Sequence, residues 1–181
     1  NPHVVTRGLL REPIKNIRRA DYIFLTKSNG GNHLRHLKTF MRRHNRRAEI
    51  IECCHRPQYV EMVYDRGKRQ NLEFMRGRKI AAISGIARPE SFEAFLIEHG
   101  AEVVATSRFA DHHRFTENEL IKFRDLAIET GAEIIMTTEK DAVRMPLING
   151  ESPPFYFLRI EIDILSGQES FDQCISRICF L

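Results

Sequence analysis

The sequence predicts an α/β protein with a mostly parallel sheet and helices on both faces. Short apolar runs typical of buried strands recur along the chain, among them "KIAAIS", "AEVVATSRF" and "AEIIMT". Amphipathic segments with helix start and stop signals separate these runs. Strands that alternate with helices pair through crossover connections, and such connections favour parallel pairing.

The first third of the chain contains two predicted strands and one basic helix. "ADYIFLTKSN" predicts a strand over Tyr22–Leu25, and "AEIIECCH" predicts a second one. Between them, after a Gly30-Gly31 turn, "NHLRHLKTFMRRHNRRAE" predicts an amphipathic helix. On this helix one side carries Leu34, Leu37, Phe40 and Met41, and another carries Arg35, Lys38, Arg42 and Arg46.

From Lys79 onward the strand and helix signals sharpen. A helix is expected to begin at Pro89 after the strand "KIAAIS" and the Gly85 turn, and to end at Gly100. Thr116 and Glu119 predict a capping box for a helix that ends near Gly131. The remaining expected elements are the strand "AEIIMT", a short helix capped by Thr138, the alternating strand "FYFLRIEIDI" and the helix "SFDQCISRICF".

Composition favours a folded, soluble chain that we expect to be cytoplasmic. Of the 181 residues, 42% are hydrophobic and 29% charged, no apolar run is long enough to span a bilayer, and the start lacks a signal-peptide pattern. Cys53-Cys54-His55 lacks the ligand spacing of a zinc site, which favours reduced thiols. The net charge of +4 allows a polyanionic partner, and the basic helix could be a solvated face, a contact to anionic lipid or a nucleic-acid surface.

Polar stretches follow four predicted strands: "TKSNGG", "SGIARP", "FADHH" and "MTTEKD". Ligands of parallel sheets bind beyond the carboxyl ends of the strands, so we expect these stretches at one edge. "SGIARPESF" and "TTEKDA" offer helix N-termini that suit anions, or simply capped helices. Near the start, Arg11 and Glu12 precede Pro13, a pattern that is ordinarily a surface ion pair.

The Asp111-His112-His113 run leaves three interpretations open. Asp111 could stabilise a turn with both histidines in solvent, since aspartate bonds nearby backbone amides. The three side chains could bind a metal, although adjacent residues point in different directions. Alternatively, a carboxylate could orient one histidine that transfers a proton.

Taken together in order, five stretches resemble one family. "RGLLREP", "RADYIFLTKS", "AAISGIARPESFEAFL", "FADHHRFTENEL" and "IIMTTEKDAVRM" are similar to the C-terminal part of tetraacyldisaccharide 4'-kinase, the lipid A kinase of Gram-negative bacteria. The resemblance extends from about Arg7 to Met145. It implies transfer of the ATP γ-phosphate, with Mg²⁺, to the 4'-hydroxyl of a tetraacyldisaccharide 1-phosphate. It also implies a peripheral enzyme at the cytoplasmic face of the inner membrane.

The resemblance further implies a fold related to P-loop NTPase-like kinases and a division into domains. Residues 1–55 would end the nucleotide-binding domain, 56–78 would form a two-stranded linker, and 79–181 would form the C-terminal α/β domain. His112 matches the family histidine of an acid/base dyad, with Asp111 in support. Arg11 and Glu12 match a pair that reaches ATP and, indirectly through Glu12, Mg²⁺. "TTEKDA" matches a structural or site-shaping motif, and His113 is given no role.

The family's phosphate loop and its Asp-Asp Mg²⁺ motif lie upstream of "LREP" and are not in this sequence. We therefore expect these residues alone to be inactive, as a truncated part of the enzyme. Two other hypotheses remain, a degenerate non-catalytic remnant and a basic α/β module that binds nucleic acid or another polyanion. A nucleic-acid partner is not expected, because aromatic residues make up 9% and Trp is absent.

Overall fold

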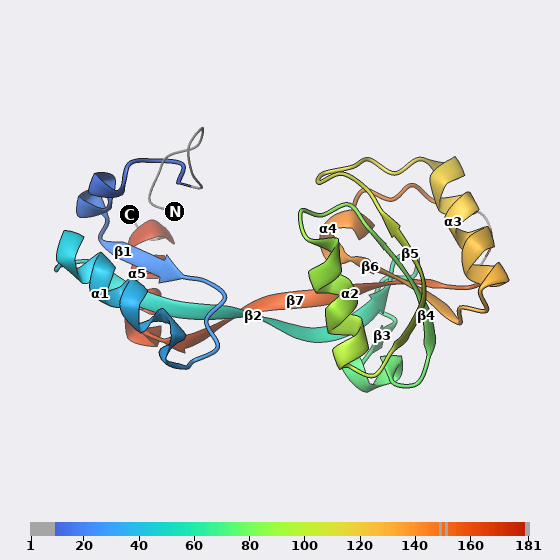
Figure 1. Ribbon diagram of the computed structural model, residues 1–181, viewed down its shortest axis with the longest axis horizontal. Coiled ribbons are helices and arrows are strands. Elements are labelled where there is room, and N and C mark those ends of the chain that lie inside the picture. Colours follow the sequence, from blue (N-terminus) through green and yellow to red (C-terminus); the bar gives the residue numbers. More distant parts are fainter. Residues whose placement is uncertain (1–9, 149, 151, 180–181) are drawn as a thin grey trace. The chain divides into compact units, whose positions relative to one another are not determined.

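The computed structural model describes residues 10–148, 150 and 152–179, and its contacts divide the chain into two compact units. The first comprises the chain up to Arg56 together with the segment from Ile162, and the second comprises Pro57–Glu161. Strand β2 (Glu49–Met62) passes from the first unit into the second, and β7 (Phe155–Ser166) passes back (Figure 1).

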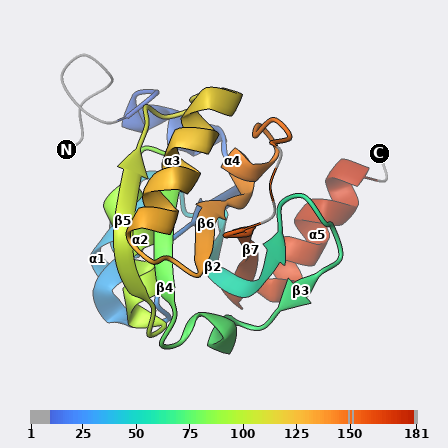
Figure 2. The same cartoon turned by 90° about the vertical axis from the view of Figure 1, so that its right-hand side faces the viewer.

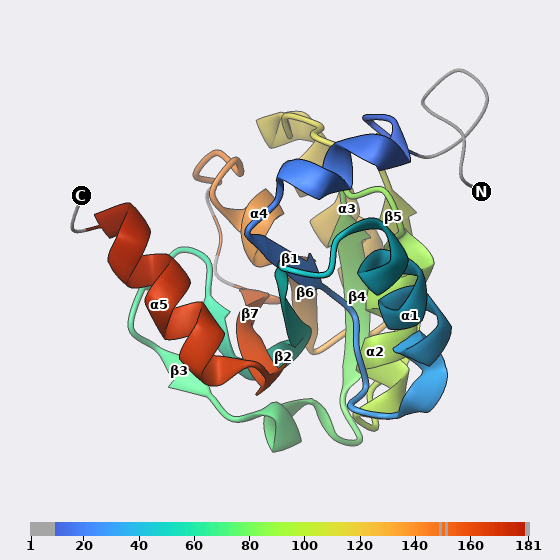
Figure 3. The same cartoon turned by 90° about the vertical axis from the view of Figure 1, so that its left-hand side faces the viewer.

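The first unit is built around strand β1 (Tyr22–Leu25), which pairs in parallel with the start of β2 (Figure 3). Its other elements are η1 (Ile14–Arg19), η2 (Asn32–Leu34), α1 (Arg35–His44) and α5 (Gln168–Cys179). Helix α5 packs against β1 through an edge-to-face contact between Phe24 and Phe171, whose ring centroids are 6.2 Å apart. The predicted strand and basic helix are confirmed, and β2 is longer than expected.

A buried carboxylate joins the parts of the first unit. Glu52 on β2 is 5% exposed and forms an ion pair with Lys38 of α1. Its oxygens also accept hydrogen bonds from Ser28 Oγ at 2.9 Å and from Ser166 Oγ at 3.0 Å. Lys38, ahead of the other contacts, lowers the pKa of Glu52, so the side chain is ionised and fully paired.

The side chains of α1 are buried and exposed in a partly different pattern from the one that the sequence predicts. Lys38 turns inward to Glu52, and the Arg42 guanidinium donates to the Ala48 carbonyl, so these two cations stabilise the unit. Leu37 and Phe40 are each 37% exposed and stay partly uncovered. The difference arises because the helix packs around a buried carboxylate, which its own periodicity does not reveal.

The second unit contains a parallel sheet in the order β7, β6 (Ile134–Thr138), β4 (Lys79–Ser84) and β5 (Glu102–Arg108). Its remaining elements are β3 (Arg69–Gln70), η3 (Leu72–Met75), α2 (Pro89–Glu98), α3 (Glu117–Glu129) and α4 (Glu139–Ala142). The predicted fold class, a mostly parallel α/β sheet with helices on both faces, is confirmed.

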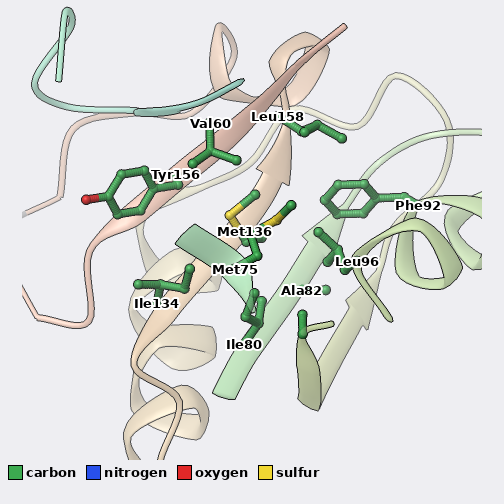
Figure 4. Close-up of a cluster of buried hydrophobic side chains, with 11 residues drawn as sticks. Val60, Met75, Ile80, Ala82, Phe92, Leu96, Ile134, Met136, Tyr156 and Leu158 are labelled. Carbon is green, nitrogen blue, oxygen red and sulfur yellow. The ribbon is translucent and has the colours of Figure 1, made fainter. Parts of the chain in front are cut away.

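Alternate residues of the same strands supply two separate cores. Ile80, Ala82 and Met136 pack with Phe92 and Leu96 of α2 (Figure 4). The intervening residues, among them Ala81, Ile83 and Ile135, pack with Leu120 and Phe123 of α3. Helix α3 lies over this face of the sheet (Figure 2). Strands buried on both faces explain why these segments are continuously apolar in the sequence.

Helix starts follow the predicted signals. Pro89 occupies the first turn of α2, and Thr116 and Glu119 form a reciprocal capping box for α3. Thr138 caps α4 by accepting from the Asp141 amide. In the described part of the chain, no helix is long and apolar enough to cross a membrane.

The compact units have other bounds than the domains expected from the sequence, and the roles expected for those domains stay predictions. Residues 56–78 lie in the second unit apart from Arg56 itself, while the end of β7 and helix α5 group with the first unit. A strand long enough to serve both units gives one continuous alternating pattern, so the sequence shows no boundary near Ile162. The segments that pass between the units are β2 and β7.

The Glu52 network predicts a stability effect with a defined pH dependence. We expect Glu52→Gln to lower the free energy of unfolding at pH 7 by about 2 kcal/mol, because Lys38 loses its buried partner. The folded pKa of Glu52 lies below the ordinary value of 4.5. Its contribution is therefore complete above about pH 4.5 and is lost as the pH falls through the folded value.

Denaturant unfolding from pH 7 down to pH 3 checks this expectation, with the exposed Glu169→Gln on α5 as the control. The difference between the wild type and Glu52→Gln should shrink as the pH falls. A difference that stays constant over this range would contradict the assignment.

Candidate functional site

The loops that follow β4, β5 and β6 meet at the carboxyl edge of the second unit's sheet. They contain Gly85, the Asp111-His112-His113 run and helix α4 with the turn after it. Strands β5 and β6 lie on opposite sides of β4, and α2 and α3 cover opposite faces. Such a switch point is where open parallel sheets place ligand sites.

Asp141 connects α4 to the loop after β4. Its side chain is fully buried, and Oδ2 accepts hydrogen bonds from the Gly85 amide at 3.0 Å and from Thr138 Oγ1 at 2.7 Å. Thr138 Oγ1 in turn accepts from the Asp141 amide at 3.3 Å. Oδ1 of Asp141 is also buried, and no hydrogen-bond partner for it exists among the described residues.

Gly85 connects Asp141 to the loop that contains His112, because it bonds both residues. Its carbonyl accepts from the His112 amide at 3.1 Å. A Cβ at position 85 would lie 3.2 Å from His113 Cβ and 3.3 Å from the Ala110 carbonyl oxygen. Both distances are shorter than ordinary contacts, so the two loops approach this closely only because residue 85 is glycine.

His112 occupies an unusual backbone conformation with an exposed ring. Its φ of 66° is left-handed, which costs a non-glycine residue on the order of 1 kcal/mol, and its side chain is 66% exposed. Nδ1 lies 3.0 Å from Nη2 of Arg144. A guanidinium only donates, so Nδ1 is the acceptor and the proton of the neutral ring sits on Nε2. The Asp111 carboxylate is 3.8 Å from Nε2, beyond hydrogen-bond range.

His113 points into the loop and stabilises it. Its ring stacks on Phe109 with centroids 4.5 Å apart, and Nε2 lies 3.1 Å from a Glu119 oxygen. Glu119 also forms the capping box with Thr116. The Thr116 amide, with His113 second, lowers the pKa of Glu119. The structure therefore gives His113 the structural role that the sequence left undecided.

A pocket of about 650 Å³ opens beside His112. Its polar lining consists of His112, Arg114 and Arg144, and its apolar lining includes Phe115, Val143 and Met145. Pro146 also lines the pocket, and its carbonyl accepts a hydrogen bond from the Tyr64 hydroxyl at 2.9 Å. Burial raises the pKa of Tyr64 to about 12, so this donor keeps its proton at neutral pH.

The predicted site residues fall into the two units. Asp111 and His112 lie in the second unit, together with the "SGIARP" and "TTEKDA" stretches. Arg11 and Glu12 lie in the first unit, where Glu12 accepts from Arg19 at 2.7 Å and from Asn16 at 3.1 Å. "TKSNGG" is also in the first unit, with Ser28 bound to Glu52. The roles predicted for Asp111, His112, Arg11 and Glu12 stay predictions.

Two residues of this site were missed in the sequence. The sequence predicts Asp141 only as part of a capped helix and predicts no role for Arg144. The helix-capping pattern of Thr138 and Asp141 was visible, but the bond to Gly85 joins residues 56 positions apart. Among the described residues, no group of three or more His, Cys, Asp or Glu side chains is placed to hold a metal ion.

Comparison with known proteins identifies the family. The model of the LpxK family, described as tetraacyldisaccharide-1-P 4'-kinase, matches residues 1–179. The chain belongs to this family. A tetraacyldisaccharide 4'-kinase from Anaeromyxobacter sp. (strain Fw109-5) is 35% identical over 178 residues, which cover 97% of this chain and 47% of that protein. One from Halothermothrix orenii is 31% identical over 189 residues, covering 96% and 49%.

The fold agrees with this family. The crystal structure of LpxK from Aquifex aeolicus in complex with ATP superimposes with a TM-score of 0.61 at 20% sequence identity. The match covers 98% of this chain and 48% of that one. The chain therefore spans about half the length of the relatives it matches. The predicted resemblance to the family is confirmed, and the chain shares the fold of the matching part of that structure.

The Asp141 contacts predict that this side chain fixes the histidine loop. We expect Asp141→Ala to lower the free energy of unfolding by about 2 kcal/mol, because the buried Gly85 amide loses its acceptor. The His112 amide, which donates to Gly85, should exchange with solvent faster. Chemical denaturation and amide hydrogen exchange measure the two effects.

Asp125→Ala on the exposed face of α3 is the matched control and should change neither quantity by more than a few tenths of a kcal/mol. Unchanged protection of the His112 amide in Asp141→Ala would show that Asp141 does not position the loop.

Proposed function

We propose that the protein carrying this chain transfers the γ-phosphate of ATP to the 4'-hydroxyl of a tetraacyldisaccharide 1-phosphate. The observation that carries the proposal is the match of the tetraacyldisaccharide-1-P 4'-kinase family over residues 1–179, which includes the whole site around His112. The same match disfavours the alternative of a basic, non-catalytic nucleic-acid module. The degenerate-remnant alternative is decided by activity of the complete gene product.

His112 takes the role of a proton-transfer group in this proposal. As the sugar hydroxyl attacks phosphorus, its O–H bond breaks, an O–P bond forms, and the bond to the ADP oxygen breaks with its electron pair. The imidazole is exposed at the sheet edge and beside a pocket, where it can exchange that proton. Asp111, whose carboxylate lies 3.8 Å from Nε2, is proposed as the supporting residue.

ATP and Mg²⁺ are the cofactors that the proposal requires. Arg11 and Glu12 are exposed in the first unit and are proposed to act on the nucleotide side. Both carboxylate oxygens of Glu12 already accept hydrogen bonds from Arg19, so Glu12 suits contact with Mg²⁺ through a coordinated water. Bound Mg²⁺ would neutralise phosphate charge during transfer.

A peripheral position at the cytoplasmic face of the inner membrane completes the proposal, and α1 is its proposed contact. Leu37 and Phe40 leave apolar surface exposed on this helix. Arg35 and Arg43 are exposed on the same helix and make no ion pair among the described residues. Apolar side chains flanked by arginines suit the interface of an anionic lipid surface.

Loss of the imidazole should abolish most of the transfer. In the complete gene product we expect His112→Ala to lower kcat by roughly a hundredfold or more with ATP and the disaccharide lipid. His55→Ala, which removes an exposed histidine from β2, should leave kcat within a factor of two, roughly the scatter expected of a surface change. A folded wild type without transfer activity would refute the proposed function, and a His112→Ala variant as active as the wild type would refute the role of the imidazole.

Reversing one charge on α1 should weaken membrane binding. We expect Arg43→Glu to reduce co-sedimentation with phosphatidylglycerol-containing vesicles by roughly tenfold at low salt, because each basic residue near an anionic surface contributes about 1 kcal/mol. Lys122→Glu on α3 changes the net charge equally and serves as the control. Equal losses for both variants would show that net charge, rather than α1, governs the binding.

A further inference from the structure

The arginines around the His112 pocket differ from most others in the second unit. Arg108 is paired with Glu90 and Glu93, and Arg159 is paired with Glu139 and Glu161. Arg114 and Arg144 have no carboxylate within 4.0 Å among the described residues. The pocket thus gathers two cations that the fold leaves without counter-ions.

Arg144 is also incompletely hydrogen bonded. Its Nη2 donates to Nδ1 of His112 at 3.0 Å, whereas Nη1 is buried and has no partner among the described residues. A buried guanidinium nitrogen without an acceptor is costly, and a neutral imidazole is a weaker acceptor than an anion. Two-pronged binding of a phosphoryl group would satisfy both nitrogens of this guanidinium.

We propose that the pocket formed by His112, Arg114 and Arg144 binds a phosphoryl group, and that this group takes Arg144 away from His112 Nδ1. The pocket volume of about 650 Å³ accommodates a phosphate with part of the molecule that carries it.

Release of Arg144 would change the hydrogen bonding of the His112 imidazole. While Nδ1 accepts from Arg144, Nε2 carries the ring proton and neither nitrogen can take another. Once a phosphoryl group binds Arg144, Nδ1 has a free lone pair and the ring faces an anion instead of a cation. Binding of the phosphoryl group would therefore convert His112 into a proton acceptor. This step rests on the proposed function, whereas the anion site itself does not.

Inorganic phosphate is the probe for the site, with the complete gene product labelled in its histidine rings with ¹⁵N. We expect phosphate to shift the His112 ring resonances saturably, and the Nδ1 resonance to report the loss of the hydrogen bond from Arg144. Arg144→Gln and Arg114→Gln should each weaken phosphate binding by roughly tenfold or more, measured by calorimetry. Arg108→Gln removes a carboxylate-paired arginine nearby and should leave the affinity unchanged.

Two further ligands distinguish the source of the phosphoryl group. Displacement of phosphate by glucosamine 1-phosphate identifies the acceptor's 1-phosphate, and displacement by ATP identifies the donor. Phosphate shifts that are absent, or equal in the wild type and in a folded Arg144→Gln, would overturn the proposal. Arg114→Gln provides the same test at an exposed position if Arg144→Gln does not fold.

Transfer activity measured in parallel separates the two proposals. A wild type that binds phosphate but transfers none contradicts the kinase function and leaves the anion site in place. An active wild type whose Arg144→Gln and Arg114→Gln variants keep full phosphate affinity contradicts the anion site alone.

Discussion

The hydrogen bonds that the buried Asp141 carboxyl accepts from Gly85 and Thr138 determine the geometry of the candidate site. They join the ends of β4 and β6, and the Gly85 carbonyl extends the connection to the loop after β5 by accepting from His112. The bond from the His112 amide to Gly85 holds the left-handed backbone of His112, and strained residues persist only where their surroundings fix them.

The same segment supplies both constraints on the histidine. Asp141 acts on the backbone of His112 through Gly85, and Arg144, three residues later, acts on the ring. The backbone of Arg144 is itself tied to the Asp141 carbonyl at 2.8 Å. One short helix and the turn after it therefore position an imidazole and place a cation beside it, which explains why a "TTEKDA" stretch that resembles a simple capped helix belongs to the site.

Periodicity and capping signals in the sequence predicted most of the fold, because strands buried on both faces and reciprocal caps are local patterns. The place of Asp111 and His112 after a predicted strand made them candidates, and the resemblance to the family supplied the roles expected of them. The structure places both residues at the sheet edge. The sequence does not predict the contacts of Asp141 and Arg144, because their partners are distant in the chain. The ion pair of Lys38 is not predicted for the same reason, since its partner Glu52 lies on another element.

The most direct test of the account is a double-mutant cycle between Asp141 and His112, measured as kcat for phosphate transfer by the complete gene product. If Asp141 acts through His112, Asp141→Ala should lower kcat in the wild-type background and cause no further loss in the His112→Ala background. Independent losses that multiply in the double variant would show that Asp141 serves the reaction by another route and would contradict the account.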